Sequence, residues 1–248
     1  MAGRFAVGDR VFVPSSKIPG LDDLASVFWE STVAEVANKK IKVDLRRGET
    51  SDWIGTSLCH KNIGVLILTF GDLQSEATLL DPLAKSVLQY CRLLVQDDYL
   101  RAYKIRSAKE LKKIWSVEQL NYSHVIFIGH GSQQGYMFAN NGWVSPEIIE
   151  KALKVRGAPR KVFISLCCQT GYADVGKPLS KMAISSHFIA PFHSVHGAVA
   201  SQFAQTFLAH HLLDGKTTHV AFRHARESTP NGASFRLWKN GNMTAGPR

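Results

Sequence analysis

Residues 125–131 read VIFIGHG, and residues 162–171 read VFISLCCQTG. Each stretch begins as a short apolar run and ends in glycine and polar residues, a pattern typical of central strands in a parallel sheet. In such sheets, ligands and reacting groups lie just beyond the carboxyl ends of the strands. If the two strands are neighbours, the imidazole of His130 and the thiol of Cys168 face each other at one edge of the sheet. An imidazole beside a thiol is the minimum apparatus for nucleophilic catalysis by cysteine.

From residue 63 onward, apolar runs of strand type alternate with segments of helical spacing. Strands are predicted at 65–70, 99–105, 125–128, 162–166 and 187–190, and helices at 82–95, from 107, from 145, and at 177–184, 198–213 and 216–226. Asp81 and Ser107 are the expected N-caps of the first two helices. This alternation predicts an α/β three-layer sandwich with a mainly parallel sheet, which we assign to residues 63–240.

Residues 1–60 have a different pattern, with short strand-like segments joined by tight polar turns. The segments are 8–14, 31–36, 40–45 and 51–54. Such a pattern predicts a small antiparallel β-barrel. The order Gly-Asp-x-Val, Trp-x-x-x-Val, Ile-x-Val, Gly-Glu, Trp-Ile resembles the Tudor-like small barrels, which often bind peptides or nucleic acid. In that case Phe28, Trp29 and Trp53 line an aromatic surface for a methylated cation; the alternative is that they pack in the core or between domains.

The residues around His130 and Cys168 suit acyl transfer. The glycines beside His130 let the backbone turn sharply and let a substrate approach. The amides of Gly131 and Cys168 are then the expected donors to a negatively charged oxygen, while His130 serves as base and later as acid. Adjacent residues on a strand point to opposite faces, so we expect Cys167 to lie in the core. The alternative for Cys168 itself is a buried structural thiol.

The two stretches together resemble the caspase-like (clan CD) cysteine peptidases, which include caspases, gingipains, separase and CHAT peptidases. The likeness is strongest to CHAT domains, whose second block typically reads Ser-Ala-Cys-Asn-Thr-Gly. Residues 166–171 fit this block with Cys168 as the nucleophile and Cys167 in the alanine position. The likeness runs over residues 63–238, with further matching segments at 142–148, 188–200 and 212–225. It implies a His130–Cys168 dyad and a caspase-like fold.

The chain also departs from the CHAT pattern. Many CHAT domains carry a tryptophan and an acidic residue in the loop after the fifth strand, where this chain has His193-Ser194-Val195-His196-Gly197. Leu166 stands where several Arg- or Lys-specific relatives have an acid. A basic residue at the cleavage site would therefore have to be recognised by Asp174.

The expected substrate-binding residues are Asp174, Phe192, His193 and His196. His193 and His196 are three residues apart, which offers a metal site as the alternative, although the chain shows no further ligands at a recognisable spacing. No Walker-type glycine loop is present. We therefore predict that no cofactor and no metal is required.

The composition and net charge of the chain indicate its cellular location and limit its possible partners. Four cysteines, two of them adjacent, make no disulfide framework, which favours a cytoplasmic location. No membrane span or signal-peptide core is present in the sequence. The net charge of +10 raises the question of nucleic acid, but without a basic-aromatic motif we expect such binding only indirectly or through a basic surface.

Two function classes follow. The first is a thiol protease that cleaves a protein partner. The resemblance implies that such an enzyme is an effector of prokaryotic antiphage defence, activated by a regulatory or sensor protein. The second is a non-catalytic scaffold that uses the N-terminal barrel for partner recognition.

Overall fold

A seven-stranded sheet forms the centre of the computed structural model, which describes residues 5–21, 27–45, 48–119, 121–155 and 158–247. Its strand order is β14-β13-β12-β11-β7-β5-β6. The five strands from β12 to β6 run parallel, and β13 and β14 are antiparallel additions at one edge. The bounds are β5 Gly64–Phe70, β6 Leu100–Lys104, β7 Tyr122–Gly129, β11 Lys161–Ser165, β12 Ser185–Pro191, β13 Phe235–Lys239 and β14 Asn242–Ala245.

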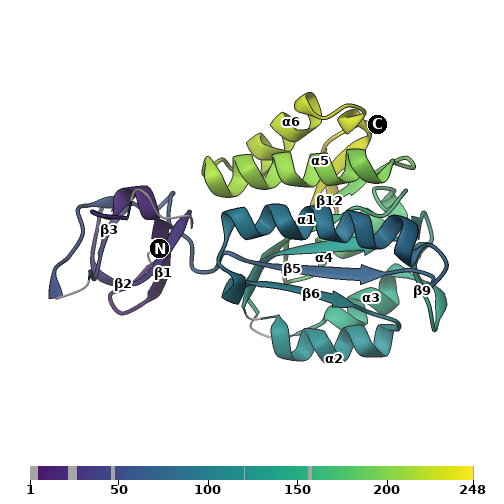
Figure 1. The fold of residues 1–248 in the computed structure, drawn as a ribbon, viewed down its shortest axis with the longest axis horizontal. Helices are drawn as coiled ribbons and strands as arrows, with labels where there is room; N and C mark the ends of the chain where they lie inside the picture. Colours follow the sequence, from purple (N-terminus) through teal and green to yellow (C-terminus); the bar gives the residue numbers. More distant parts are fainter. Residues whose placement is uncertain (1–4, 22–26, 46–47, 120, 156–157, 248) are drawn as a thin grey trace.

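Helices cover both faces of this sheet, as Figure 1 shows. One layer contains α1 (Asp81–Leu94), α5 (Gly197–Leu208) and α6 (Thr218–Ser228); the other contains α2 (Ala108–Glu118), α3 (Pro146–Leu153) and α4 (Ala173–Lys181). Strand β5 explains the arrangement, because Val65 and Ile67 pack into the first layer while Leu66 and Leu68 pack into the second. An apolar strand that is buried on both faces needs helices on both sides. The predicted three-layer α/β fold with a mainly parallel sheet is confirmed.

The N-terminal residues form a separate antiparallel sheet with the order β1-β2-β3-β4. Its strands are β1 Arg10–Pro14, β2 Phe28–Ala37, β3 Lys40–Val43 and β4 Ile54–Gly55, and they curl around their own apolar core. The sheet lies at the left of Figure 1, beside the amino ends of the parallel strands. This matches the expected small all-β unit, while its likeness to Tudor barrels stays a prediction.

The aromatic residues of this unit have different surroundings. Phe28 is buried and lies in the main core together with Phe12, and its ring contacts His60 edge-on at 5.2 Å. Trp53 is 42% exposed beside the Lys42 ammonium. Trp29 lines a cavity of about 460 Å³ in the N-terminal unit. Phe28 therefore follows the packing alternative and is not part of an open aromatic surface.

Several local expectations need correction. A short π-helix, η3 (Glu76–Leu80), leads directly into α1, so Asp81 continues a helix and does not cap one. Helix α4 begins at Ala173, earlier than expected. A second short π-helix, η5 (Ala209–Leu213), follows the end of α5. Ser107 does cap α2 and accepts a hydrogen bond from the Glu110 amide at 3.1 Å.

A small three-stranded sheet was not predicted. It consists of β8 (Gly131–Ser132), β9 (Gly135–Phe138) and β10 (Gly142–Val144), and it follows β7 directly. Its strands are only two to four residues long, which is too short for a periodicity to identify them. Among the described helices, none has the length and apolar character that a membrane span requires.

Candidate active site

The strands that precede His130 and Cys168 are neighbours. Strands β7 and β11 pair in parallel with Ser165 opposite Phe127, and the Leu166 amide extends the pairing with a 2.8 Å bond to the Phe127 carbonyl. The two segments that follow these strands then leave the sheet at its carboxyl edge. A Cβ atom on Gly131 would lie 2.6 Å from the Cys168 carbonyl oxygen. The two predicted motifs are therefore in direct backbone contact.

The turn that carries Cys168 is held by buried hydroxyl groups. Ser165 Oγ and Thr170 Oγ1 are 2.7 Å apart, and Thr170 Oγ1 donates to the Cys167 carbonyl at 2.8 Å. Gln169 has a φ of 60°, a left-handed conformation that is rare for a residue with a side chain. These features turn the chain sharply just after Cys168.

The two adjacent cysteines have opposite environments. Cys167 is fully buried in the layer that contains Phe127 and Tyr136, as predicted, and burial raises the pKa of its thiol well above the usual range. Cys168 is partly exposed, whereas Cys59 and Cys91 are buried like Cys167. Cys168 is therefore the accessible thiol of the four.

The thiol of Cys168 is not hydrogen-bonded to His130 in this structure. Its Sγ lies 3.8 Å from the carbonyl oxygen of Val195, which belongs to the loop between β12 and α5. Catalytic hydrogen bonds are often long or misaligned before substrate binds. The structure thus has the sulfur turned toward this loop.

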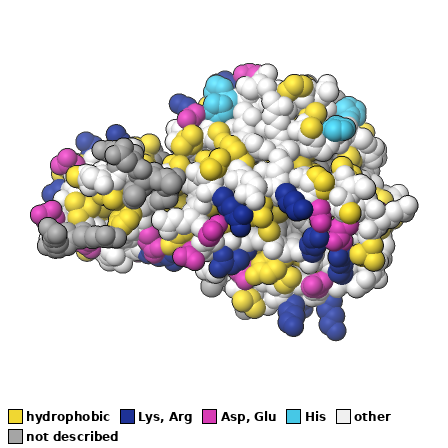
Figure 2. Space-filling model, in the orientation of Figure 1, with side chains coloured by type: hydrophobic (Ala, Val, Ile, Leu, Met, Phe, Trp, Pro, Cys, Tyr) yellow, Lys and Arg dark blue, Asp and Glu magenta, His cyan; other side chains and the backbone are white. Residues whose placement is uncertain are grey.

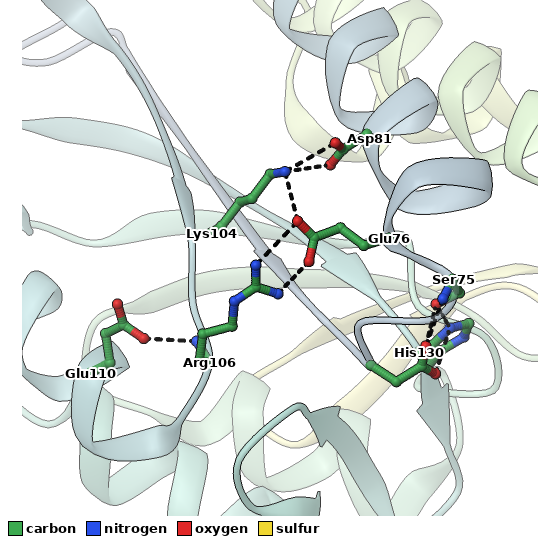
Figure 3. A network of polar contacts seen from close by, with 8 residues as sticks. Ser75, Glu76, Asp81, Lys104, Arg106, Glu110 and His130 are labelled. Atoms are coloured by element: carbon green, nitrogen blue, oxygen red, sulfur yellow. Dashed lines mark hydrogen bonds and ion pairs between the residues drawn. The ribbon is translucent and has the colours of Figure 1, made fainter.

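His130 has two partners that the sequence did not suggest. Its Nε2 atom lies 2.6 Å from Ser75 Oγ and 3.4 Å from Asp72 Oδ2. Figure 3 shows His130 and Ser75 facing each other. Both partners follow β5, which is the neighbour of β7 and pairs Phe70 with Gly129 at the same edge of the sheet. Three segments that are distant in sequence therefore meet at this site.

The hydrogen bonds of Asp72 fix the direction of the proton chain. Its Oδ1 accepts from the Ser75 amide at 2.7 Å and from the Ser75 hydroxyl at 2.9 Å, and these bonds lower the pKa of the carboxyl group. Asp72 is therefore ionised and only accepts. Because Ser75 has a single hydroxyl proton and gives it to Asp72, the Ser75 oxygen must accept from Nε2–H of His130.

The other ring nitrogen of His130, Nδ1, is free to act as a base. With the proton on Nε2, the Nδ1 atom of a neutral His130 has a lone pair, and no described residue forms a hydrogen bond with it. The hydrogen bond on one ring nitrogen selects which nitrogen is free for chemistry. His130 is thus held in the tautomer that a base needs.

An ion-pair network anchors the segment that carries Asp72 and Ser75. Glu76 accepts from Lys104 at 2.7 Å and from both terminal nitrogens of Arg106, and these bonds lower its pKa to about 2. Lys104 also pairs with Asp81 at 2.9 Å. Figure 3 shows this network next to Ser75 and His130. It ties the start of η3 to the edge strand β6, and so fixes the partners of His130.

The expected oxyanion donors, the amides of Gly131 and Cys168, belong to the two segments that leave the sheet here. The amide of Cys168 has no backbone acceptor among the described residues, since its turn leaves the sheet before this position. Gly131 pairs with Tyr136 in the β8–β9 hairpin and lies against Cys168. The two amides come from two neighbouring strand ends, and their role as donors remains a prediction.

The expected substrate-binding residues differ in their exposure and in their contacts. Asp174 is exposed in the first turn of α4 and makes no ion pair with a described residue. Phe192 lies between other groups, with the Arg236 guanidinium 3.4 Å from its ring centre and Tyr172 at 4.4 Å. His193 is exposed and contacts the Phe192 ring at 4.3 Å.

His196 has a structural task in the same loop. Its Nδ1 accepts from the Ala198 amide at 3.2 Å and caps α5. In the part of the chain that the structure describes, no three His, Cys, Asp or Glu side chains are arranged to hold a metal ion. The metal alternative for His193 and His196 therefore gains no further ligand, and their role in substrate binding stays a prediction.

Replacement of Gly131 by alanine tests the contact between the two motifs. The added Cβ would meet the Cys168 carbonyl at 2.6 Å and Cys167 Cβ at 2.8 Å. We expect a loss of about 1–3 kcal/mol in the free energy of unfolding. We also expect roughly 100-fold lower activity, because the nucleophile is displaced.

Chemical denaturation and turnover measurements check both numbers. Gly55→Ala is the matched control, because the nearest atom to its added Cβ is Ser57 Oγ at an ordinary 3.7 Å. A Gly131→Ala variant as stable and active as the Gly55→Ala variant would contradict the described contact.

Solved structures of other proteins share the fold of this chain. A secreted C11 cysteine protease from Bacteroides thetaiotaomicron, solved with an irreversible peptide inhibitor, is similar to 72% of the chain with a TM-score of 0.53 and 10% identity. An inactive zymogen of a C11 protease from Parabacteroides distasonis is similar to 71% of the chain with a TM-score of 0.51 and 12% identity. The chain has a caspase-like fold.

The caspase-like fold is what these similarities show. The matches span 66% and 61% of the two proteases, a little under two thirds of their lengths. The chain matches no family model and no curated protein. In the caspase-like fold of this chain, the predicted His130 and Cys168 lie at the carboxyl edge of the sheet. Sequence reasoning missed Asp72 and Ser75.

Proposed function

We propose that the protein is a cysteine endopeptidase that cleaves a protein substrate through Cys168 and His130. The observation that carries the proposal is the meeting of three strand ends at one edge of the sheet. They bring together an accessible thiol, an imidazole whose chain neighbour Gly131 lies against the turn that carries the thiol, and a carboxylate-hydroxyl pair that orients the imidazole. A purely structural role explains neither the exposure of Cys168 nor the Asp72–Ser75–His130 chain.

The chemistry proceeds in two steps. His130 takes the thiol proton through Nδ1, and the sulfur of Cys168 attacks the substrate carbonyl carbon. The carbonyl oxygen becomes negative and accepts hydrogen bonds from the amides of Gly131 and Cys168. The C–N bond then breaks, the leaving amine takes the proton from His130, and a thioester remains. In the second step, His130 takes a proton from water, and the hydroxide attacks the thioester carbon. The C–S bond then breaks, the acid product leaves, and His130 returns its proton to the sulfur.

A peptide library with a thiol-reactive warhead tests the proposal. The C11 protease from Bacteroides thetaiotaomicron was solved with an irreversible peptide inhibitor, which supports this choice of probe. We expect covalent labelling confined to Cys168 and lost in His130→Ala, with Cys167 unlabelled because it is buried. Mass spectrometry of the labelled peptides measures this. Absence of labelling at Cys168 with all co-purified partners present would favour the scaffold alternative.

We further propose that a regulatory partner switches the enzyme on. The Cys168 sulfur faces the Val195 carbonyl and not His130, and the partner would move the loop between β12 and α5 so that the two side chains pair. One of the similar structures is an inactive zymogen, which supports controlled activity in this fold. An antiphage effector held inactive in the cytoplasm suits such control, and the four free cysteines are consistent with a reducing compartment.

The N-terminal sheet is the proposed docking unit for that partner. Because Phe12 and Phe28 pack into the main core, deleting residues 1–60 would also expose that core. Surface substitutions are therefore the cleaner test, and Trp53→Ala removes an exposed ring without touching the junction. We expect partner-dependent cleavage to fall and labelling of Cys168 by a small warhead to remain. Unchanged cleavage in the presence of the partner would argue against docking through this face.

Nucleic acid remains a secondary partner in the proposal. Figure 2 shows Lys and Arg side chains interspersed with Asp and Glu on the face it presents. Mixed signs do not make the continuous basic stripe that tracks a phosphate backbone. With a net charge of +10, nucleic acid stays in the proposal as a partner bound only indirectly or through a basic surface.

A further inference from the structure

A second polar cavity lies at the opposite edge of the sheet from Cys168. It has a volume of about 400 Å³ and is formed where the parallel strands β7, β11 and β12 begin. The residues that give it its chemistry are His60, Lys61, His124, Arg160, His187 and His211. Its volume is in the range of small-molecule sites. The proposed peptidase chemistry uses none of these residues.

Three of the histidines have a buried ring nitrogen without a hydrogen-bond partner in the structure. These atoms are Nε2 of His124, Nδ1 of His187 and Nδ1 of His211. The other nitrogens of two rings are used, because His124 Nδ1 lies 2.8 Å from Ser123 Oγ and His211 Nε2 lies 3.2 Å from Thr218 Oγ1. Buried polar atoms of folded proteins are nearly always hydrogen-bonded, so three in one cavity indicate an occupant.

The charged residues around the cavity indicate the sign of the charge that its occupant carries. None of the described lining residues is an Asp or a Glu. Arg160 makes no ion pair with a described residue and donates only to the Ala183 carbonyl at 3.3 Å, while Lys61 pairs with Asp9. The occupant that fits is an anion with several acceptor oxygens.

The titratable groups that face the histidines are all basic. His187 faces His211, His219, Lys239 and Arg160, and His124 faces His211, His60 and Lys161. Lys161 is buried, and its ammonium donates to the Tyr122 carbonyl at 2.7 Å. An anion in the cavity would therefore be attracted from several elements at once.

We propose that this cavity binds a phosphoryl group, as free phosphate or as a small phosphomonoester, through His124, His187, His211 and Arg160. Tetrahedral oxygens accept bonds from donors that converge from different directions, and these four residues line the cavity from four different segments of the chain. The site is independent of the proposed peptidase, because it lies at the other edge of the sheet. It also joins the N-terminal sheet to the α/β unit, since His60 pairs with Phe12 of β1 by two backbone bonds.

The histidines make the binding dependent on pH. Burial first, and then the neighbouring basic groups, lower the pKa of His187 to about 4 and that of His124 well below its ordinary value. Without an anion, the unfolded chain binds more protons than the folded one as the pH falls below about 6.5, so stability falls between about pH 6.5 and pH 4. A bound phosphate favours the protonated rings and opposes this loss. Binding should therefore be tighter at pH 6.0 than at pH 7.5.

Calorimetry and thermal unfolding with inorganic phosphate test the proposal, using sodium chloride at matched ionic strength as the reference. We expect a saturable rise in Tm with phosphate and a lower Kd at pH 6.0 than at pH 7.5. Arg160→Gln and His187→Gln should each raise the Kd about 10-fold, the cost of losing one charged hydrogen bond. Arg223→Gln, which removes an exposed charge from α6, should leave it unchanged. Titrations with a nucleoside 5′-monophosphate and with glycerol phosphate distinguish a phosphomonoester from free phosphate.

The variants can be judged independently of the ligand. Their Tm values in chloride report whether they fold, and we expect wild-type-like folding because Arg160 is exposed and His187 is only half-buried. If phosphate stabilises the wild type no better than chloride, or stabilises Arg160→Gln and His187→Gln as much as the wild type, the proposal is wrong.

Discussion

Replacing Cys168 with alanine is expected to lower peptide cleavage by about 10⁴-fold or more, the loss typical of removing a nucleophile. Without the sulfur no thioester forms, and only the much slower direct attack of water on the peptide bond remains. The variant should keep its fold, because the Cys168 side chain is partly exposed and makes only a weak 3.8 Å contact with Val195. Profiling the wild type and the variant on a peptide library, with and without co-purified partners, measures the effect.

The neighbouring cysteine supplies the control. Cys167 is fully buried and its sulfur faces the Phe127 carbonyl on the other side of the chain. Cys167→Ala should therefore lose some stability and keep most of the activity. Undiminished cleavage by Cys168→Ala would refute the assignment of the nucleophile.

Replacing Asp72 with asparagine is the second large expected effect. The asparagine side chain can donate to Ser75 Oγ, which would free the Ser75 proton for His130 Nε2 and place the imidazole proton on Nδ1. His130 would then be in the wrong tautomer to take a proton from the thiol. We expect kcat to fall about 10- to 100-fold, less than the roughly 10⁴-fold loss of a buried triad aspartate, since the Asp72 side chain is 46% exposed.

Steady-state kinetics separate this role from a structural one. KM should change little, because Asp72 does not contact substrate in the proposed chemistry. Ser75→Ala should lower kcat similarly, while Asp98→Asn, at an exposed position before β6, should have no effect. Equal kcat values for Asp72→Asn and the wild type would show that the Asp72–Ser75–His130 chain has no part in the reaction.

The α/β fold was predictable because it follows from short-range patterns of apolar residues in the sequence. The runs at 65–70, 125–128 and 162–166 are apolar at nearly every position, which is typical of strands buried on both faces of a sheet. The prediction that His130 and Cys168 share an edge needed one more condition, that β7 and β11 are adjacent. Their parallel pairing confirms it.

The rest of the site depends on strand order, which no local pattern contains. Gly71-Asp72-Leu73-Gln74-Ser75 has the composition of an ordinary polar loop. The role of this loop at the site becomes apparent only from the pairing of β5 with β7, which places Asp72 beside His130. The same strand-end rule that identified His130 and Cys168 also applies to Asp72, so the signal was present in the residue's position after an apolar strand.

The histidine cavity was hidden for a related reason. His124, His187 and His211 lie on three different elements, and each one alone is typical of a packing or surface residue. Only the folded chain brings them to one cavity, where their unpaired nitrogens become apparent. The small three-stranded sheet of β8, β9 and β10 was missed because its strands are too short to show a periodicity.

A crystal structure of the adduct between the protein and a peptide with a thiol-reactive warhead is the most direct test of the proposed dyad. We predict a covalent bond from Cys168 Sγ to the probe, with His130 Nδ1 within hydrogen-bond reach of the reacting group and its Nε2 still on Ser75. The probe's carbonyl oxygen should lie between the amides of Gly131 and Cys168. A probe bound to another cysteine, or an adduct at Cys168 with His130 turned away from it, would contradict the account.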